Sequence, residues 1–233
     1  MRQPSGYSQE DDLSATLARA FMRRWLPFKE RRRQKLLKET FDVIKEQAIR
    51  AETNDYKALL TIMNIALFFL IAERDIQSIK IDALTHPDKW TRKLHARVIL
   101  LTIHEWDMDK VSGGALRSAL ETVGASEEIR KEAIEALRAV RLVQRKAKKE
   151  FGSVRNATIA HRESNALLQY RMIDELKTRN VFELTAEFYK AAHRYVDLMP
   201  HMMSACGTIP ALLKQWKQSQ EKSAPKNAQV GTG

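Results

Sequence analysis

Apolar residues recur at spacings of three and four positions along most of this 233-residue chain, with polar residues between them. This is the period of an α-helix that turns one face toward a core. Residues that interrupt helices are few, with 8 glycines and 6 prolines, and no run of alternating β-branched residues indicates a strand. The pattern predicts an all-α protein in which helices follow one another with short breaks.

Four helices are expected in the first hundred residues. The first extends from about 12 to 26 and is expected to end at Pro27, and the second from about 28 to 51. The third, which Asn54 can cap, contains the apolar run 58–72, and the fourth begins at the cap Asp88. The first two carry one-sided apolar stripes: Leu13, Leu17, Phe21 and Trp25, then Leu37, Phe41, Ile44 and Ala48. Because 58–72 is shorter than the ~20 residues that cross a bilayer, we expect a buried helix and no membrane span.

The second half of the chain contains the clearest helix signals. Ser126 can cap a helix that ends near residue 150, with acidic residues in its first turn and many cations in its last, as the helix dipole favours. Gly152 is expected to break this helix and Ser153 to cap the next, which should reach about 176. A last long helix is expected from about 181 to 203. Its buried stripe is expected at Leu184, Phe188, Ala191, Tyr195 and Leu198.

Three parts are expected along the chain. Residues 1–53 form a basic N-terminal helical arm, 54–206 a helical bundle, and 207–233 a short helix with a disordered tail, because the end of the chain has little apolar surface. The single cysteine, Cys206, allows no intrachain disulfide and no cysteine zinc cluster. With no secretory-signal pattern at the start of the sequence, we expect a cytoplasmic protein.

The charge is strongly positive, with 40 Lys and Arg against 29 Asp and Glu and a net charge of +11. Such a charge favours a polyanionic partner, either nucleic acid or an anionic membrane surface. The stretch 19–50 has eleven basic residues against four acidic ones, with Trp25 and Phe28 among them. A nucleic-acid arm, an amphipathic helix on a membrane and a solvated face are all open for this stretch, and nucleic acid is favoured over the membrane.

The most informative stretch is RNATIAH, from Arg155 to His161. It brings together a permanent cation, the amide of Asn156 and a titratable imidazole. A cation that holds a phosphate and a base that takes a proton are the minimum requirement for metal-free phosphodiester chemistry. An Arg and a His at this distance are common by chance, but an Asn directly after the Arg makes the strict pattern rare.

Residues 154–163, VRNATIAHRE, resemble the motif of the HEPN superfamily, the all-helical domains of prokaryotic toxins, abortive-infection proteins and RNA-targeting defence systems. The stretch is most similar to the abortive-infection branch, in which Arg-Asn or Arg-Asp leads into Ala-His. The resemblance implies an antiparallel helical bundle over 54–206, with extra N-terminal helices, and an endoribonuclease that needs neither metal nor cofactor. It implies that His161 takes the proton from a ribose 2′-hydroxyl, that Arg155 holds the phosphate and that Asn156 orients the RNA backbone.

Helix geometry adds a condition to this hypothesis. Six residues of α-helix turn by about 600° and rise by about 9 Å, so Arg155 and His161 do not share one stripe. A homodimer that brings two motifs into one cleft solves this, and the resemblance implies the same arrangement. The further candidates for substrate binding are Arg145, Lys146, Lys148, Lys149 and Asn165.

The expected partners are RNA, a second copy of the chain, and an antitoxin or defence-system protein. The alternative is a non-catalytic helical module that binds RNA or a partner and dimerises through the motif. The sequence alone leaves both open.

Overall fold

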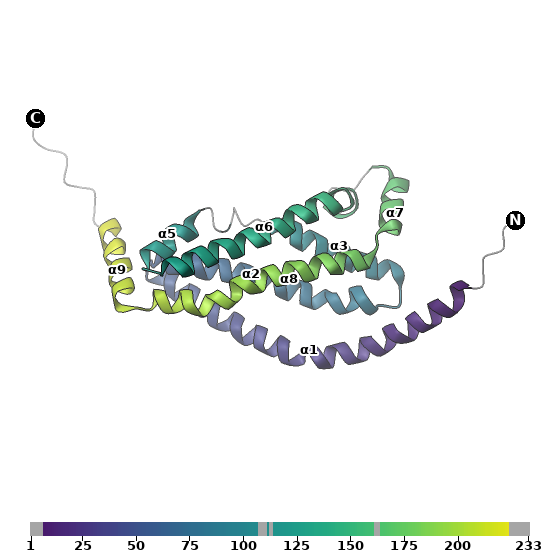
Figure 1. Ribbon diagram of the computed structural model, residues 1–233, viewed down its shortest axis with the longest axis horizontal. Helices are drawn as coiled ribbons and strands as arrows, with labels where there is room; N and C mark the ends of the chain where they lie inside the picture. The colour runs from purple at the N-terminus through teal and green to yellow at the C-terminus, as the bar shows by residue number, and fades with distance from the viewer. Residues whose placement is uncertain (1–6, 107–110, 112–113, 161–163, 224–233) are drawn as a thin grey trace, which may run out of the picture. The chain divides into compact units, whose positions relative to one another are not determined.

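The computed structural model describes residues 7–106, 111, 114–160 and 164–223, which form helices and connecting turns with no strand among them (Figure 1). The prediction of an all-α protein is confirmed. The elements in chain order are α1 (Tyr7–Thr53), α2 (Lys57–Thr85), α3 (Lys89–Glu105), α5 (Ala115–Thr122), α6 (Glu127–Arg155), the π-helical turn η1 (Asn156–Ala160), α7 (Ala166–Glu175), α8 (Thr178–Cys206) and α9 (Ile209–Ser223). None of the helices in these ranges is long and apolar enough to cross a membrane.

The chain forms two compact units, each built from segments that are far apart in the sequence. The first unit takes in 1–38, 71–106 and 142–189. The second takes in 39–70, 107–141 and 190–233. Helices α1, α2, α6 and α8 therefore each contribute one part to each unit, and the RNATIAH stretch belongs to the first.

Each unit has its own buried aromatic contact. In the first, the rings of Trp106 and Phe188 meet edge to face with 4.7 Å between their centroids. The Gln144 side chain of α6 donates to the carbonyl of Trp106, which fixes the end of α3. In the second, Phe69 of α2 stacks on Tyr195 of α8 at 4.9 Å. Large buried aromatic contacts of this kind stabilise a helical core.

Helix α1 runs antiparallel to α2 within the first unit. As residue numbers rise along α1, those of the ion-pair partners on α2 fall: Arg23 with Asp82 at 3.6 Å, Glu30 with Lys80 at 3.0 Å, and Arg33 with Glu73 at 2.9 Å. The expectation that Pro27 ends the first helix is wrong, because Pro27 lies inside α1. A proline in a helix interior costs about 3 kcal/mol. Ion pairs to the same neighbour lie on both sides of Pro27, so α1 follows α2 across the proline.

Several helix ends are those that the sequence predicts. Asp88 caps α3 by accepting from the backbone N–H of Thr91 at 2.7 Å. Ser126 Oγ accepts from the backbone N–H of Ile129, at 3.3 Å, at the start of α6. All five residues of the expected stripe of α8 are buried.

Two other predicted ends are wrong. Asn54 does not cap α2, because its side chain donates to the carbonyl of Arg50, at 2.7 Å, and closes α1. Gly152 does not break α6, which continues through Ser153 to Arg155. A glycine inside a helix costs only about 1 kcal/mol, and the neighbouring Phe151 is buried, so packing outweighs that cost. The expected helix from 153 to 176 is divided between the end of α6, η1 and α7.

Candidate functional site

The RNATIAH stretch lies where the helix type changes. Helix α6 ends at Arg155, and η1 occupies 156–160. A π-helical turn inside or beside an α-helix frees backbone groups for other partners and is frequent at functional sites. His161 lies outside the described residues, so its placement relative to Arg155 stays a prediction.

Two side chains from neighbouring helices hold the carbonyl groups of η1. Arg97 of α3 donates through Nη1 to the carbonyl of Thr158 at 3.0 Å. Gln169 of α7 donates through Nε2 to the carbonyl of Ala157 at 3.1 Å. The hydroxyl of Thr158 donates to the carbonyl of Val154, at 2.6 Å, in the last turn of α6. The turn that follows Arg155 is therefore fixed from α3 and from α7.

Helix α3 supports this arrangement with three cations, of which Arg97 contacts η1 and Lys89 and Lys93 contact α7. Arg97 is buried, and its guanidinium lies 5.9 Å from the centre of the Trp90 ring. Lys93, also buried, bonds to the carboxylate of Asp174 at 3.0 Å and to its carbonyl. Lys89 bonds to the same carboxylate at 2.9 Å. The hydrogen bonds from Lys89 and Lys93 lower the pKa of Asp174.

Arg155 is half-buried, and its guanidinium already has two partners within the chain. Nη2 forms an ion pair with the carboxylate of Glu105 at the end of α3. Nη1 donates to the side-chain oxygen of Asn156 at 2.7 Å. These contacts fix the direction of the guanidinium, and the exposed carboxylate of Glu105 competes for it with any incoming phosphate.

His104 is a member of this cluster that the sequence analysis did not join to the motif. Desolvation lowers the pKa of His104 most, and the positive charge of Arg155 lowers it further; a hydrogen bond with the backbone of Ala147 acts against both. The imidazole is therefore neutral at pH 7. Nε2 of His104 and Nε of Arg155 are both buried, and neither has a hydrogen-bond partner among the described residues.

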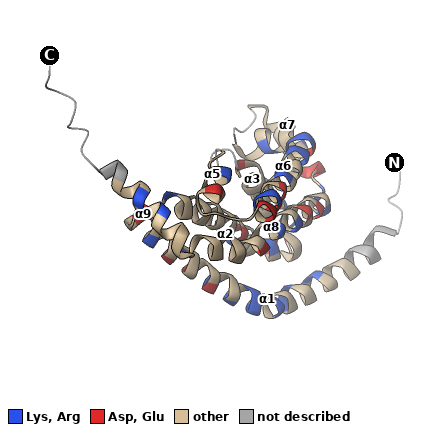
Figure 2. Cartoon of the chain, turned by 60° about the vertical axis from the view of Figure 1, so that its left-hand side comes forward, with Lys and Arg blue, Asp and Glu red and all other residues tan. Residues whose placement is uncertain are grey.

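The four predicted cations of α6 divide into two kinds. Lys146 forms an ion pair with Glu187 of α8 at 2.6 Å, and this contact raises its pKa. Arg145, Lys148 and Lys149 are exposed and lie within three turns of Arg155 on the same helix. Figure 2 shows Lys and Arg along α6. Seven residues turn an α-helix by about 700°, so Lys148 lies on the same face of α6 as Arg155, whereas Arg145 and Lys149 lie about 80° and 120° away around the helix.

Asn165 has a local structural task. Its side-chain oxygen accepts from the backbone N–H of Leu168, at 3.0 Å, and caps α7. Its contact with a substrate stays a prediction.

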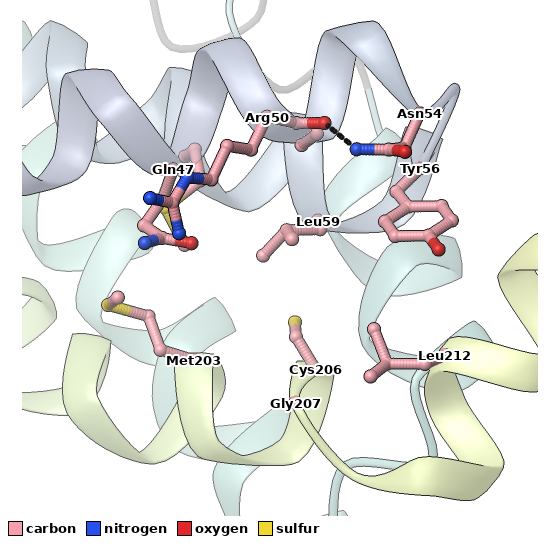
Figure 3. A pocket seen from close by; sticks show the side chains of 11 residues that line it. Gln47, Arg50, Asn54, Tyr56, Leu59, Met203, Cys206, Gly207 and Leu212 are labelled. Atoms are coloured by element: carbon pink, nitrogen blue, oxygen red, sulfur yellow. Dashed lines mark hydrogen bonds between the residues drawn. The ribbon is translucent and has the colours of Figure 1, made fainter.

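The second unit holds a separate pocket of about 330 Å³ (Figure 3). Arg50 and Tyr56 border it, and the thiol of Cys206 points into it. Burial raises the pKa of that thiol to about 12, so at neutral pH it is protonated and a poor nucleophile. The lining residues all belong to the second unit, so this pocket contributes no residue to the cluster around Arg155.

Comparisons with family models, with curated proteins and with solved structures gave no match. Function must therefore be argued from the side chains and their geometry. The residues that complete the cluster, His104 and Glu105, lie on α3, 50 or more positions before Arg155 in the sequence. The spacing of apolar residues alone does not show that α3 packs beside α6. The one local feature of the sequence that points to these residues is that His104 and Glu105 are adjacent at the end of an amphipathic helix.

Proposed function

We propose that the chain is a metal-independent endoribonuclease of the HEPN-like toxin or phage-defence kind, an antiparallel helical bundle that acts as a cytoplasmic homodimer. The observation that carries the proposal is the set of fixed contacts on Arg155, the last residue of α6, and Asn156, the first residue of η1. A guanidinium held in one direction, with the exposed cation Lys148 on the same face of α6, suits a phosphodiester.

The proposed reaction is an internal transfer at phosphorus. His161 takes the proton from the 2′-hydroxyl, whose oxygen attacks the adjacent phosphorus while the bond to the 5′-oxygen breaks. The 5′-oxygen leaves with a proton, and the other fragment ends in a 2′,3′-cyclic phosphate. Arg155 stabilises the negative charge that develops on the phosphoryl oxygens, and Asn156 orients the RNA backbone.

Glu105 gains a role that the sequence analysis did not assign. With RNA absent, its carboxylate holds the Arg155 guanidinium in place. When a phosphate arrives, two anions compete for one cation, and the exposed carboxylate of Glu105 can turn into solvent at little cost, because an exposed ion pair is weak. The ion pair therefore keeps Arg155 positioned without closing the site to RNA.

The test compares two histidine variants in the full chain. Labelled RNA is incubated with excess chelator and the unmodified chain, His161→Ala or His201→Ala; His201 is an exposed histidine of the second unit. We expect cyclic phosphate ends from the unmodified chain and from His201→Ala, and loss of cleavage in His161→Ala. Equal cleavage by all three proteins would remove His161 from the mechanism.

The shared cleft has a test of its own. Arg155→Ala and His161→Ala are each expected to be inactive as pure dimers. If the Arg of one subunit works with the His of the other, mixed dimers contain one intact site and recover cleavage. If both residues of a site come from the same subunit, mixing restores nothing.

One observation favours a second candidate, a non-catalytic module that binds RNA or a partner protein. The side chains of Arg155, Asn156 and Glu105 satisfy one another within the chain, as structural residues do. RNA binding by the unmodified chain and by His161→Ala with equal affinity, and cleavage by neither, would support this module.

A further inference from the structure

The N-terminal half of α1 exposes large apolar side chains on one face. Five of them within 16 residues are between 44% and 69% exposed: Leu13, Leu17, Phe21, Trp25 and Phe28. At 100° per residue they fall within about 120° of the helix circumference, the width of an ordinary buried stripe. Isolated exposed apolar residues need no explanation, but a continuous stripe indicates a binding surface.

This stripe is not the face with which α1 packs in its own unit. Arg23, Glu30 and Arg33 form ion pairs with α2, and Leu37 is buried. On the helical wheel these residues lie on the side opposite Phe21 and Phe28. The sequence pattern of the first helix therefore predicts a stripe correctly, and the structure turns that stripe to solvent.

Cations accompany the stripe. Residues 19–38 include nine Lys and Arg against a single acidic residue, Glu30, which is paired with Lys80. Five exposed cations in this segment are Arg24, Lys29, Arg31, Arg32 and Lys38. Lys29 lies 4.5 Å above the Trp25 ring and Arg31 lies 5.5 Å from the centre of the Phe28 ring. Figure 2 shows this basic segment along α1.

The combination of charge and apolar surface selects the partner. A second copy of α1 would bring two strongly basic segments together, which like-charge repulsion opposes. Nucleic acid would use the cations and could stack on Trp25 and Phe28, but it would leave Leu13, Leu17 and Phe21 in water. An anionic bilayer takes up both kinds of group, because apolar side chains enter the headgroup boundary while cations contact the headgroups.

We propose that residues 13–38 of α1 form a membrane-surface helix that binds anionic lipid through the stripe and the adjacent cations. The helix lies along the surface and does not span the bilayer. This surface is independent of the proposed nuclease site, since it contains none of the residues placed there.

The test uses the full chain and sedimentation with phosphatidylcholine vesicles, with and without phosphatidylglycerol. We expect binding to the anionic vesicles only, and weaker binding at high salt. Leu17→Ser/Phe21→Ser/Phe28→Ser should lose binding. The matched control Leu142→Ser/Leu167→Ser/Ile209→Ser, which changes three apolar residues exposed elsewhere, should keep it. No binding of the unmodified chain, or equal loss in both variants, overturns the proposal.

Two further measurements separate the possible partners. Arg24→Gln/Arg31→Gln/Arg32→Gln should weaken vesicle binding by about fivefold per charge, whereas Arg145→Gln/Lys148→Gln/Lys149→Gln should weaken it far less. Fluorescence of Trp25 should shift to the blue on anionic vesicles, a change that Trp25→Phe removes.

If the α1 variants bind vesicles normally but lose RNA, or if they change only the oligomeric state, the surface serves nucleic acid or a second copy instead. RNA cleavage should be the same in all the α1 variants, so failure here leaves the nuclease proposal untouched.

Discussion

The turn after Arg155 and the N-terminal half of α1 use basic residues in opposite ways. Around η1, Arg97 and Arg155 have named acceptors, and both side chains are partly or fully buried. Along α1, cations such as Arg24 and Arg32 are exposed and lie beside apolar side chains that are exposed as well. The first region holds a few groups in a defined direction. The second presents a broad surface to a partner.

This difference determines what a substitution can reveal. Removing a buried cation leaves its acceptor without a hydrogen bond and costs stability. Removing an exposed cation costs the fold almost nothing and changes only what the surface binds. Function at η1 must therefore be measured together with stability, whereas binding at α1 can be measured alone.

The largest effect is expected for Arg155→Ala in RNA cleavage. Removing one group that stabilises charge in a transition state lowers the rate by about 10²- to 10³-fold. The exposed Arg24→Ala is the control, and it should leave the initial rate on labelled RNA within about twofold, since a lone surface charge contributes little. An equal fall in both variants would mean that the protein's overall positive charge, and not Arg155 itself, supports cleavage.

A second comparison concerns stability. Arg97→Met should lower the free energy of unfolding by about 1–3 kcal/mol, because the carbonyl of Thr158 loses its donor inside the fold. Arg24→Met should change it by less than about 0.5 kcal/mol. Denaturant titration followed by circular dichroism measures both. If the two variants unfold alike, Arg97 does not hold η1 in solution.

The role of Arg155 could be proposed from the sequence, whereas the role of Arg97 could not. Arg155 stands in a rare local pattern, and caps such as Asp88 and Ser126 are equally local, so short stretches predict them. Arg97 is one of 21 arginines, and its role depends on the packing of α3 against η1, 61 positions away in the chain. Sequence spacing does not contain that contact.

Two wrong predictions of helix ends also arise because the sequence does not show contacts between distant parts of the chain. Pro27 and Gly152 are strong local signals for the end of a helix, yet both lie within helices because tertiary contacts outweigh costs of about 1–3 kcal/mol. The sequence predicts correctly that Leu13, Leu17 and Phe21 share one face of a helix, but in the structure these side chains are exposed. A pattern shows that apolar residues share a face but does not show whether the protein itself covers that face.

A smaller effect is expected when Arg155 loses its ion-pair partner, the carboxylate of Glu105. Glu105→Gln should raise RNA affinity by up to about fivefold, the upper range for an exposed ion pair. Binding of a non-cleavable RNA at two salt concentrations measures it, with Glu135→Gln, which leaves Arg194 in the second unit without its ion-pair partner, as the matched control. Weaker binding in Glu105→Gln would show that the ion pair positions Arg155 for RNA more than it competes with RNA.

The smallest expected effect is a change in the titration of His104. Its folded-state pKa is lowered from the ordinary 6.5, first by desolvation and then by Arg155. As the pH falls, the unfolded chain therefore takes up this proton before the folded chain does. The contribution of neutral His104 to the free energy of unfolding is therefore complete above pH 6.5. It is lost as the pH falls from 6.5 through the lowered pKa.

Arg155→Ala removes only the second of these causes, so the pKa of His104 should rise part of the way toward 6.5. Arg145→Ala, on an exposed turn of the same helix, should leave it where it is. The ring-proton resonances of His104 followed by NMR between pH 4 and 8 report the pKa directly, with His104→Gln to assign them. An unchanged pKa in Arg155→Ala would place the guanidinium too far from the imidazole for the two to form one site. The cluster would then reduce to Arg155, Asn156 and Glu105.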